Sequence, residues 1–173
     1  MSCRIELLKP AELERAFTII EECKRALREA SVFQWTDTYP SKETILTDIK
    51  KGHLFGLYID KVCQAIIALN ADQDLQYKAI NWEDTQVNVM VLHRLAVDPT
   101  VQKQGIGGKL VDFAENYARS NNFSSIRLDA YSGNKTVLNF YEQRNYVIKG
   151  EVFFAGRDLP FFCFEKKLSN VED

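Results

Sequence analysis

The chain alternates between segments with a two-residue hydrophobic period and segments with a helical period. Residues 3–8 (CRIELL) alternate apolar and polar side chains, which predicts a first strand. Residues 13–30 repeat apolar side chains at intervals of three and four, which predicts an amphipathic helix. A shorter helix should begin after Ser41, because serine is a favoured N-cap residue.

The middle of the chain predicts a hairpin followed by a long buried strand. Residues 54–59 and 62–70 are apolar runs that flank the polar pair DK, as the two strands of a hairpin would. Residues 87–97 (VNVMVLHRLAV) are apolar on both faces for most of their length, which is typical of a central strand. Residues 71–85 are polar with embedded aromatic side chains, and no pattern assigns them.

The last third of the chain alternates helix and strand. A helix should begin around Gly105, and residues 125–130 form the next predicted strand. Asn134 can cap a further helix, and residues 146–154 and 161–168 form two last strands. There are no repeats or low-complexity linkers, so the pattern predicts one α/β domain.

Length and composition agree with this interpretation. A chain of 173 residues fits a single domain, residues 1–173, better than two. The net charge of −2 gives no argument for binding nucleic acid or an anionic membrane. No stretch approaches the roughly 20 apolar residues of a membrane span, and the charged start of the chain does not resemble a signal peptide. We therefore expect a cytoplasmic protein.

The four cysteines are dispersed along the chain, which argues against a metal site. No two of them form a CxxC pair, and the histidines are His53 and His93 alone. A zinc site requires clustered Cys or His ligands. We therefore expect reduced, mostly buried thiols and no metal.

Three glycines occur within four residues at the junction of the predicted central strand and the next helix, in QKQGIGGK (residues 102–109). The first amides of a helix have no partner inside it, and the helix dipole makes that end positive. Glycines leave room for a phosphate to reach these amides. The segment is thus either a cradle for a diphosphate or a tight turn before a helix.

Two common phosphate motifs do not fit these residues. A P-loop requires a hydroxyl residue after its lysine, but Leu110 follows Lys109. A dinucleotide fingerprint requires a third glycine where Leu110 stands. The pattern that does fit is [RQ]xxGx[GA], with Gln102, Gly105 and Gly107 at its defined positions.

With this loop the chain resembles the GNAT superfamily of acetyl-CoA-dependent N-acetyltransferases. The resemblance extends from about Val87 to Gly150, through HRLAVDPTVQKQGIGGKL and NKTVLNFYEQRNY. It implies a mixed, mostly antiparallel central sheet of about six or seven strands with about four helices, and a central strand pair splayed to admit coenzyme A. The chain departs from the family pattern at Gln102, where arginine is also common, and at Asn145, where glycine usually ends the helix.

The resemblance implies that acetyl-CoA is the co-substrate and that the glycine loop holds its pyrophosphate. A backbone N–H near Ala96 or Val97 would donate to the thioester carbonyl. Asn134 would bind the pantetheine arm or the substrate, or would only cap its helix. The residues expected to contact the cofactor are Leu95, Ala96, Val97, Gln102, Lys103, Gln104, Gly105, Ile106, Gly107, Gly108, Lys109, Asn134 and Tyr141.

Tyr141 and His93 are the candidate catalytic residues. Tyr141 falls at the general-acid position of the family, seven residues after Asn134, where a phenol can protonate the departing thiolate. Its alternative role is that of a core tyrosine. His93 resembles the histidine of arylalkylamine N-acetyltransferases, and its pKa suits proton removal from an amine, but a strand histidine without a chemical role is equally open. The weaker candidates for the base are Asp129, Glu83 and Asp84.

The acceptor should bind near aromatic side chains of otherwise polar segments. Such rings hold amines by stacking or by cation–π contact, although core packing is the alternative for each ring. The resemblance implies a small-molecule or peptide amine as the acceptor, and both a monomer and a homodimer are open. The alternative function is a coenzyme A-binding module without transferase activity. The expected substrate-binding residues are Trp35, Tyr39, Trp82 and Asp129, with Phe33 and Tyr77 as further rings.

Overall fold

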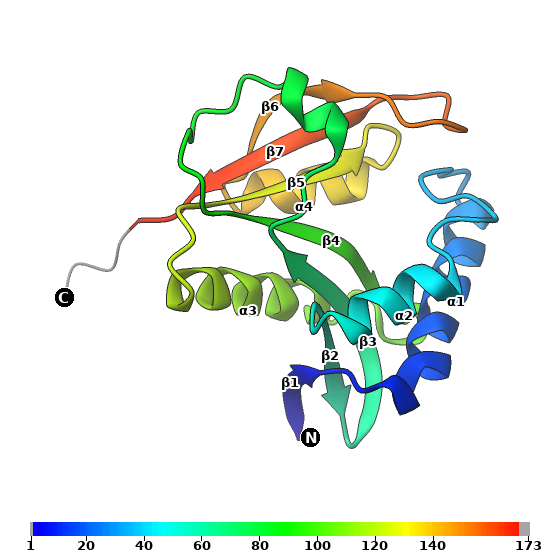
Figure 1. Ribbon diagram of the computed structural model, residues 1–173. Helices are drawn as coiled ribbons and strands as arrows, with labels where there is room; N and C mark the ends of the chain where they lie inside the picture. The colour runs from blue at the N-terminus through cyan, green and yellow to red at the C-terminus, as the bar shows by residue number, and fades with distance from the viewer. Residues whose placement is uncertain (1, 170–173) are drawn as a thin grey trace. The chain divides into compact units, whose positions relative to one another are not determined.

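The computed structural model describes residues 2–169 and contains a seven-stranded sheet (Figure 1). The strand order is β1-β2-β3-β4-β5-β7-β6. The strands are β1 (Cys3–Leu7), β2 (Leu54–Ile59), β3 (Val62–Asn70), β4 (Val89–Val97), β5 (Ser125–Tyr131), β6 (Val147–Val152) and β7 (Phe161–Lys167). The α-helices of the described residues are α1 (Leu13–Glu29), α2 (Lys42–Lys50), α3 (Ile106–Ser120) and α4 (Lys135–Gln143), and the 3-10 turns are η1 (Pro10–Glu12), η2 (Leu75–Ala79) and η3 (Pro99–Val101).

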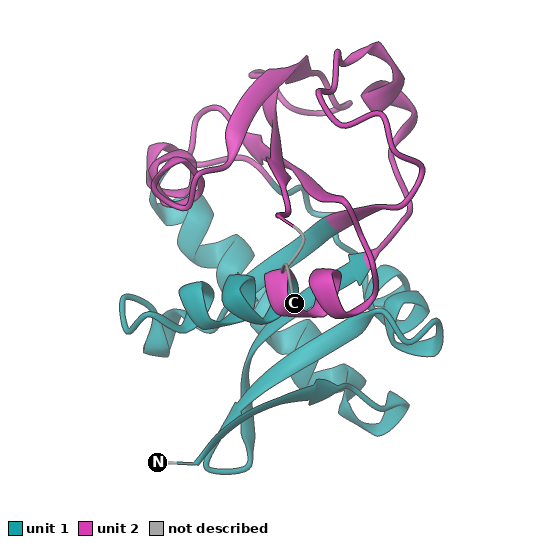
Figure 2. Cartoon of the chain, turned by 90° about the vertical axis from the view of Figure 1, so that its left-hand side faces the viewer, with its two compact units in different colours: residues 1–31, 35–69, 92–114 teal, residues 32–34, 70–91, 115–173 magenta. Residues whose placement is uncertain are grey.

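The chain divides into two compact units, coloured separately in Figure 2. Strand β4 contributes residues 89–91 to unit 2 and residues 92–97 to unit 1. The prediction of one domain spanning the whole chain stays a prediction. Unit 1 comprises Met1–Ser31, Trp35–Leu69 and Leu92–Ala114, and unit 2 comprises Val32–Gln34, Asn70–Val91 and Glu115–Asp173.

Unit 1 packs α1 and α2 against the β2-β3 hairpin. The hairpin has the predicted boundaries, and its turn residues Asp60 and Lys61 have φ angles of 47° and 74°. Two successive left-handed residues are what a type I′ hairpin turn requires. Ser41 caps α2 as predicted, because its side chain accepts a hydrogen bond from the amide of Thr44 at 3.1 Å. The buried core includes Ile19, Ile20, Ile45, Ile49, Leu54 and Ile66.

Unit 2 is built on β5, which pairs in parallel with β4 and antiparallel with β7. The parallel ladder joins residues 89–91 of β4 to residues 125–127 of β5 in three pairs. The pairs β1-β2, β2-β3, β5-β7 and β6-β7 are antiparallel. The predicted mixed, mostly antiparallel sheet with four helices is therefore confirmed, and β4 is the predicted central strand.

The ends of α4 also follow the sequence prediction. The Asn134 side chain accepts a hydrogen bond from the amide of Val137 at 3.2 Å and so caps the helix. Asn145 has a φ angle of 67°, the left-handed conformation expected where glycine usually stands. All four cysteines are free, and all but Cys3 are buried.

Candidate active site

The end of β4 is tied to the loop that follows it. The carbonyl of Val97 accepts two hydrogen bonds, one from the Cys23 thiol at 3.1 Å and one from the Gln102 side-chain amide at 3.0 Å. Burial raises the pKa of the Cys23 thiol to about 12, so this thiol stays protonated and can donate. One donor of Gln102 is therefore used within the loop itself.

Asp98 shapes the first turn of the loop. Its Oδ1 accepts from the amide and the hydroxyl of Thr100 at 2.9 and 2.7 Å, and its Oδ2 accepts from Arg15 of α1 at 2.8 Å. Burial by itself would raise the pKa of Asp98, but the bonds from Thr100 and Arg15 outweigh it, and the pKa lies below its usual value. The loop thus starts from a charged, fully engaged carboxylate.

The glycine loop has the conformation that its sequence suggests. Lys103 and Gly105 have φ angles of 62° and 77°. The amide of Lys109 donates to the Gly105 carbonyl at 3.1 Å, which is a bond of the first turn of α3. The amides of Ile106 and Gly107 come earlier in the chain, where a helix offers its amides no internal partner. Lys103, Gln104 and Lys109 are exposed. The start of α3 therefore combines a positive helix end with nearby exposed lysines.

Tyr141 is buried in unit 2. Its ring contacts Phe140, Tyr146 and Phe164, with centroid distances of 5.0, 5.5 and 5.9 Å. Tyr141 is 4% exposed. Burial, and then the negative charge of Asp129, raise the pKa of Tyr141 well above its usual value. The phenol is therefore neutral across the physiological pH range.

Asp129 is held by a buried tyrosine. The Tyr77 hydroxyl donates to Asp129 Oδ2 at 2.6 Å, and Tyr77 is 2% exposed. The Tyr77 carbonyl accepts from the Trp82 indole at 3.0 Å, and the Arg127 guanidinium lies 4.3 Å from the Trp82 ring centroid. Tyr77 and Trp82 thus have packing roles in unit 2, and an acceptor role for Trp82 stays a prediction.

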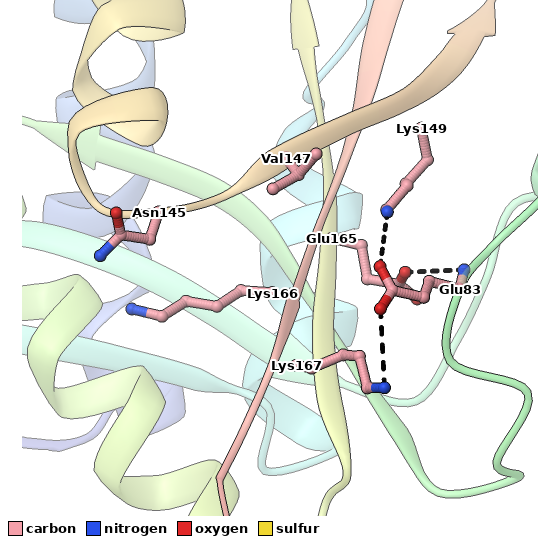
Figure 3. Close-up of a pocket in the computed structure, with 7 residues that line it drawn as sticks. All are labelled: Glu83, Asn145, Val147, Lys149, Glu165, Lys166 and Lys167. Carbon is pink, nitrogen blue, oxygen red and sulfur yellow. Dashed lines mark hydrogen bonds and ion pairs between the residues drawn. The ribbon is translucent and has the colours of Figure 1, made fainter.

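The weaker base candidates Glu83 and Asp84 have structural partners. Figure 3 shows Glu83 at a surface pocket of unit 2, paired with Lys149 at 2.7 Å and Lys167 at 3.7 Å. The hydrogen bond from Lys149 is the main cause that lowers the pKa of Glu83. Asp84 is buried and accepts from Ser124 and from the amide of Gln86 at 2.5 and 2.9 Å. These contacts favour the charged carboxylates and make both poorer proton acceptors.

The remaining predicted residues are divided between the two units. His93 is half-buried on β4. Trp35 is half-buried against the core of unit 1, and the Tyr39 hydroxyl accepts from Arg94 at 3.0 Å. Phe33 of unit 2 is 55% exposed. Asn134 also donates to the side chain of Gln34 at 2.8 Å, in addition to its capping role.

Sequence reasoning did not find Arg15, Asp48 and Arg94. Arg15 and Asp98 are 83 residues apart, and no local pattern connects them. Only the spacing of Asp98 and Thr100 before a helix carries a signal, since aspartate followed by a hydroxyl residue is typical of a capped turn.

The described residues contain no group of three or more Cys, His, Asp or Glu that could hold a metal ion. None of the helices within residues 2–169 is long and apolar enough to cross a bilayer.

Comparison with known proteins identifies the family. The model of the acetyltransferase (GNAT) family matches residues 17–146, three quarters of the chain, and the chain belongs to this family. It is therefore an acetyltransferase, a class of enzymes whose co-substrate is acetyl-CoA. It is 26% identical over 146 residues to the uncharacterized N-acetyltransferase YesJ of Bacillus subtilis strain 168. The aligned region covers 83% of this chain and 78% of that protein.

Solved structures of the family share the fold. A GNAT-family acetyltransferase of Streptococcus agalactiae 2603 has a TM-score of 0.82 at 20% identity, with 95% of each chain covered. The PaiA N-acetyltransferase of Thermoplasma acidophilum, solved in complex with coenzyme A, has a TM-score of 0.71 at 20% identity, with 96% of this chain and 99% of that chain covered. The GNAT-like fold predicted from the sequence is thus confirmed.

Proposed function

We propose that this protein transfers the acetyl group of acetyl-CoA to an amine acceptor by direct attack in a ternary complex. The observation that carries the proposal is the conformation of residues 102–109, a glycine loop that opens α3 with exposed lysines beside it. In this role the amides of Ile106 and Gly107 and the charges of Lys103 and Lys109 bind the pyrophosphate. The family membership supports acetyl-CoA as the ligand.

In this proposal the Gln102 side chain does not donate to the phosphate. Because it donates to the Val97 carbonyl, it closes the loop and leaves the phosphate to the backbone amides and the lysines. Together with the bond from the Cys23 thiol, the bond from Gln102 keeps the Val97 carbonyl occupied. We assign the thioester carbonyl to the amide of Ala96 or Val97.

Tyr141 is proposed as the general acid. The amine nitrogen attacks the thioester carbon, the carbon–sulfur bond breaks, and the departing thiolate takes the proton of the phenol. A buried phenol of raised pKa is a weak acid, so this transfer is favourable only where the same dehydrated surroundings also raise the basicity of the thiolate. The attacking nitrogen loses its proton to His93 or to water.

The acceptor class is proposed to be a small-molecule or peptide amine. Trp35, Tyr39 and Asp129 are the residues proposed to contact it, as an apolar ring, a phenol and a carboxylate suited to a cationic amine. Trp82 is also proposed to contact the acceptor, but only with the face of its ring, because its indole N–H donates to the Tyr77 carbonyl. A coenzyme A-binding module without transfer is the second candidate function.

Incubation of the protein with acetyl-CoA and a broad panel of amines tests the proposal. Release of free thiol, together with the mass increase of one acetyl group on an amine, is the expected result. Binding of coenzyme A in calorimetry without thiol release for any amine would favour the module without activity. Absence of coenzyme A binding would contradict both functions.

A further inference from the structure

Arg94 has a backbone conformation that is costly for its residue type. Its φ angle is +50° within β4, in the left-handed region that long side chains rarely adopt. Among the described non-glycine residues with positive φ, Arg94 alone lies inside a helix or strand, whereas the others lie in turns and loops. Such a conformation persists where surrounding contacts over-determine it.

The exposure of β4 changes at the residues around Arg94. Residues 89–92 are buried, His93, Arg94 and Leu95 are half-buried in succession, and Ala96 is buried again. A left-handed residue inside a strand interrupts the extended backbone, as a bulge does, and a bulge re-aims a strand and its side chains. The backbone at residue 94 therefore sets the direction of the last three residues of β4.

Asp48 holds the Arg94 guanidinium through two parallel bonds. Arg94 Nε donates to Oδ2 at 2.6 Å and Nη2 donates to Oδ1 at 2.8 Å, and the two side chains are 11% and 7% exposed. Asp48 has a fixed position because its helix, α2, packs Ile45 and Ile49 into the core of unit 1. The Tyr39 hydroxyl accepts a third bond from Nη1 at 3.0 Å.

Stability alone is a weaker explanation for this pair. A buried ion pair often contributes no more than apolar side chains of similar volume. The pair lies, however, at the residue where β4 changes direction. Beyond this residue, the Val97 carbonyl is held by Cys23 and Gln102. The segment 95–97 is thus restrained at both ends.

We propose that Arg94 is a positioning residue for acetyl transfer, which holds the bulge of β4 through its ion pair with Asp48 and so directs the amides of Ala96 and Val97. This inference rests on the proposed function, in which one of these amides binds the thioester carbonyl. A misplacement of about 1 Å in such a site can cost about a hundredfold in rate. Arg94 itself does not contact the reacting atoms in this role.

Two double variants separate the backbone role from the charge. Asp48→Asn with Arg94→Gly and Asp48→Asn with Arg94→Ala both remove the ion pair and leave no buried charge. Glycine adopts positive φ about as readily as negative φ, whereas alanine does not. We expect kcat of the glycine variant to exceed that of the alanine variant at least about tenfold, while KM for acetyl-CoA differs by less than about threefold.

The amide chemical shifts of residues 95–97 provide a second readout that requires no turnover. We expect these shifts to stay native-like in the glycine variant and to move in the alanine variant, with both proteins folded by circular dichroism. Equal kcat values in the two variants, or equal shifts, would overturn the inference. Failure of the proposed function looks different: the native protein releases no thiol with any amine, while the shifts of the two variants still differ and support the role of Arg94 in holding the bulge.

Discussion

The guanidinium of Arg15 lies 2.8 Å from the carboxylate of Asp98, measured from Nη2 to Oδ2. Arg15 belongs to α1, and Asp98 is the residue directly after β4, so the pair joins this helix to the start of the proposed coenzyme loop. Arg15 also donates to the Cys63 carbonyl at 2.7 Å, which fixes the guanidinium against β3. The loop geometry therefore depends on contacts outside the loop.

Replacing Asp98 with asparagine should lower stability and weaken acetyl-CoA binding. The amide keeps one acceptor oxygen but loses the charge opposite Arg15, and a lost bond to a charged group costs about 1–3 kcal/mol. KM for acetyl-CoA should rise several-fold, while KM for the acceptor amine stays unchanged. Steady-state kinetics with each substrate varied in turn measures both, and an equal rise in both values would contradict a role in the loop.

The stabilising effect of Asp98 should depend on pH. Its pKa is lowered in the folded protein, so its contribution is fully present above the unfolded-state pKa of about 4 and is lost as pH falls through the folded pKa. The difference in Tm between the native protein and Asp98→Asn should be constant between about pH 6 and 8 and should narrow below about pH 4. Thermal denaturation at a series of pH values tests this sign, and a gap that widens in acid would refute it.

Gly105→Ala should weaken coenzyme A binding far more than a matched glycine substitution elsewhere. Gly105 and Gly52 have similar φ angles, 77° and 70°, and an added Cβ at either position meets no atom within 4 Å. Both substitutions should therefore cost about 1–2 kcal/mol of stability through the backbone alone. Calorimetry should show lost affinity for coenzyme A only in Gly105→Ala. Unchanged affinity would mean that the loop is only a turn.

Tyr141→Phe should lower kcat with little change in KM for acetyl-CoA. The substitution keeps the ring contacts and removes only the hydroxyl, and general acid catalysis typically contributes about 10²–10⁴-fold. Tyr146→Phe is the matched control, because Tyr146 is also buried and its hydroxyl donates to Glu115 at 3.3 Å. The control should lose stability but keep kcat. A Tyr141→Phe enzyme with nearly full kcat would make Tyr141 a core residue.

Trp35→Ala should raise KM for the acceptor more than KM for acetyl-CoA. Trp35 is half-buried against the core of unit 1, so some loss of Tm is expected as well. Trp35→Phe keeps an aromatic face and should restore most of the acceptor KM. Two KM values that change equally in Trp35→Ala, or no recovery in Trp35→Phe, would assign the ring to packing alone.

The agreement between sequence and structure is best where the signal is local. The β2-β3 hairpin has the predicted boundaries, and Ser41 and Asn134 cap the predicted helices. A cap or a turn is decided by residues within a few positions of one another, so periodicity and side-chain chemistry suffice. Strand β1 differs in one respect: its alternation predicted a strand, but Leu7 is 46% exposed, because an edge strand can leave both faces open to solvent.

By itself the sequence determined the order of the elements, the glycine loop and, through its motif, the family. Only the tertiary structure decided how the functional segments are held. Arg94 and Asp48 are 46 residues apart, and Arg15 and Asp98 are 83 residues apart, so neither pair leaves a local pattern. The left-handed conformation of Arg94 likewise has no sequence signature, because an arginine in an apolar run predicts an ordinary strand residue. Its cause is the packing of α2, which brings a buried carboxylate to the guanidinium and compensates the cost of the backbone conformation.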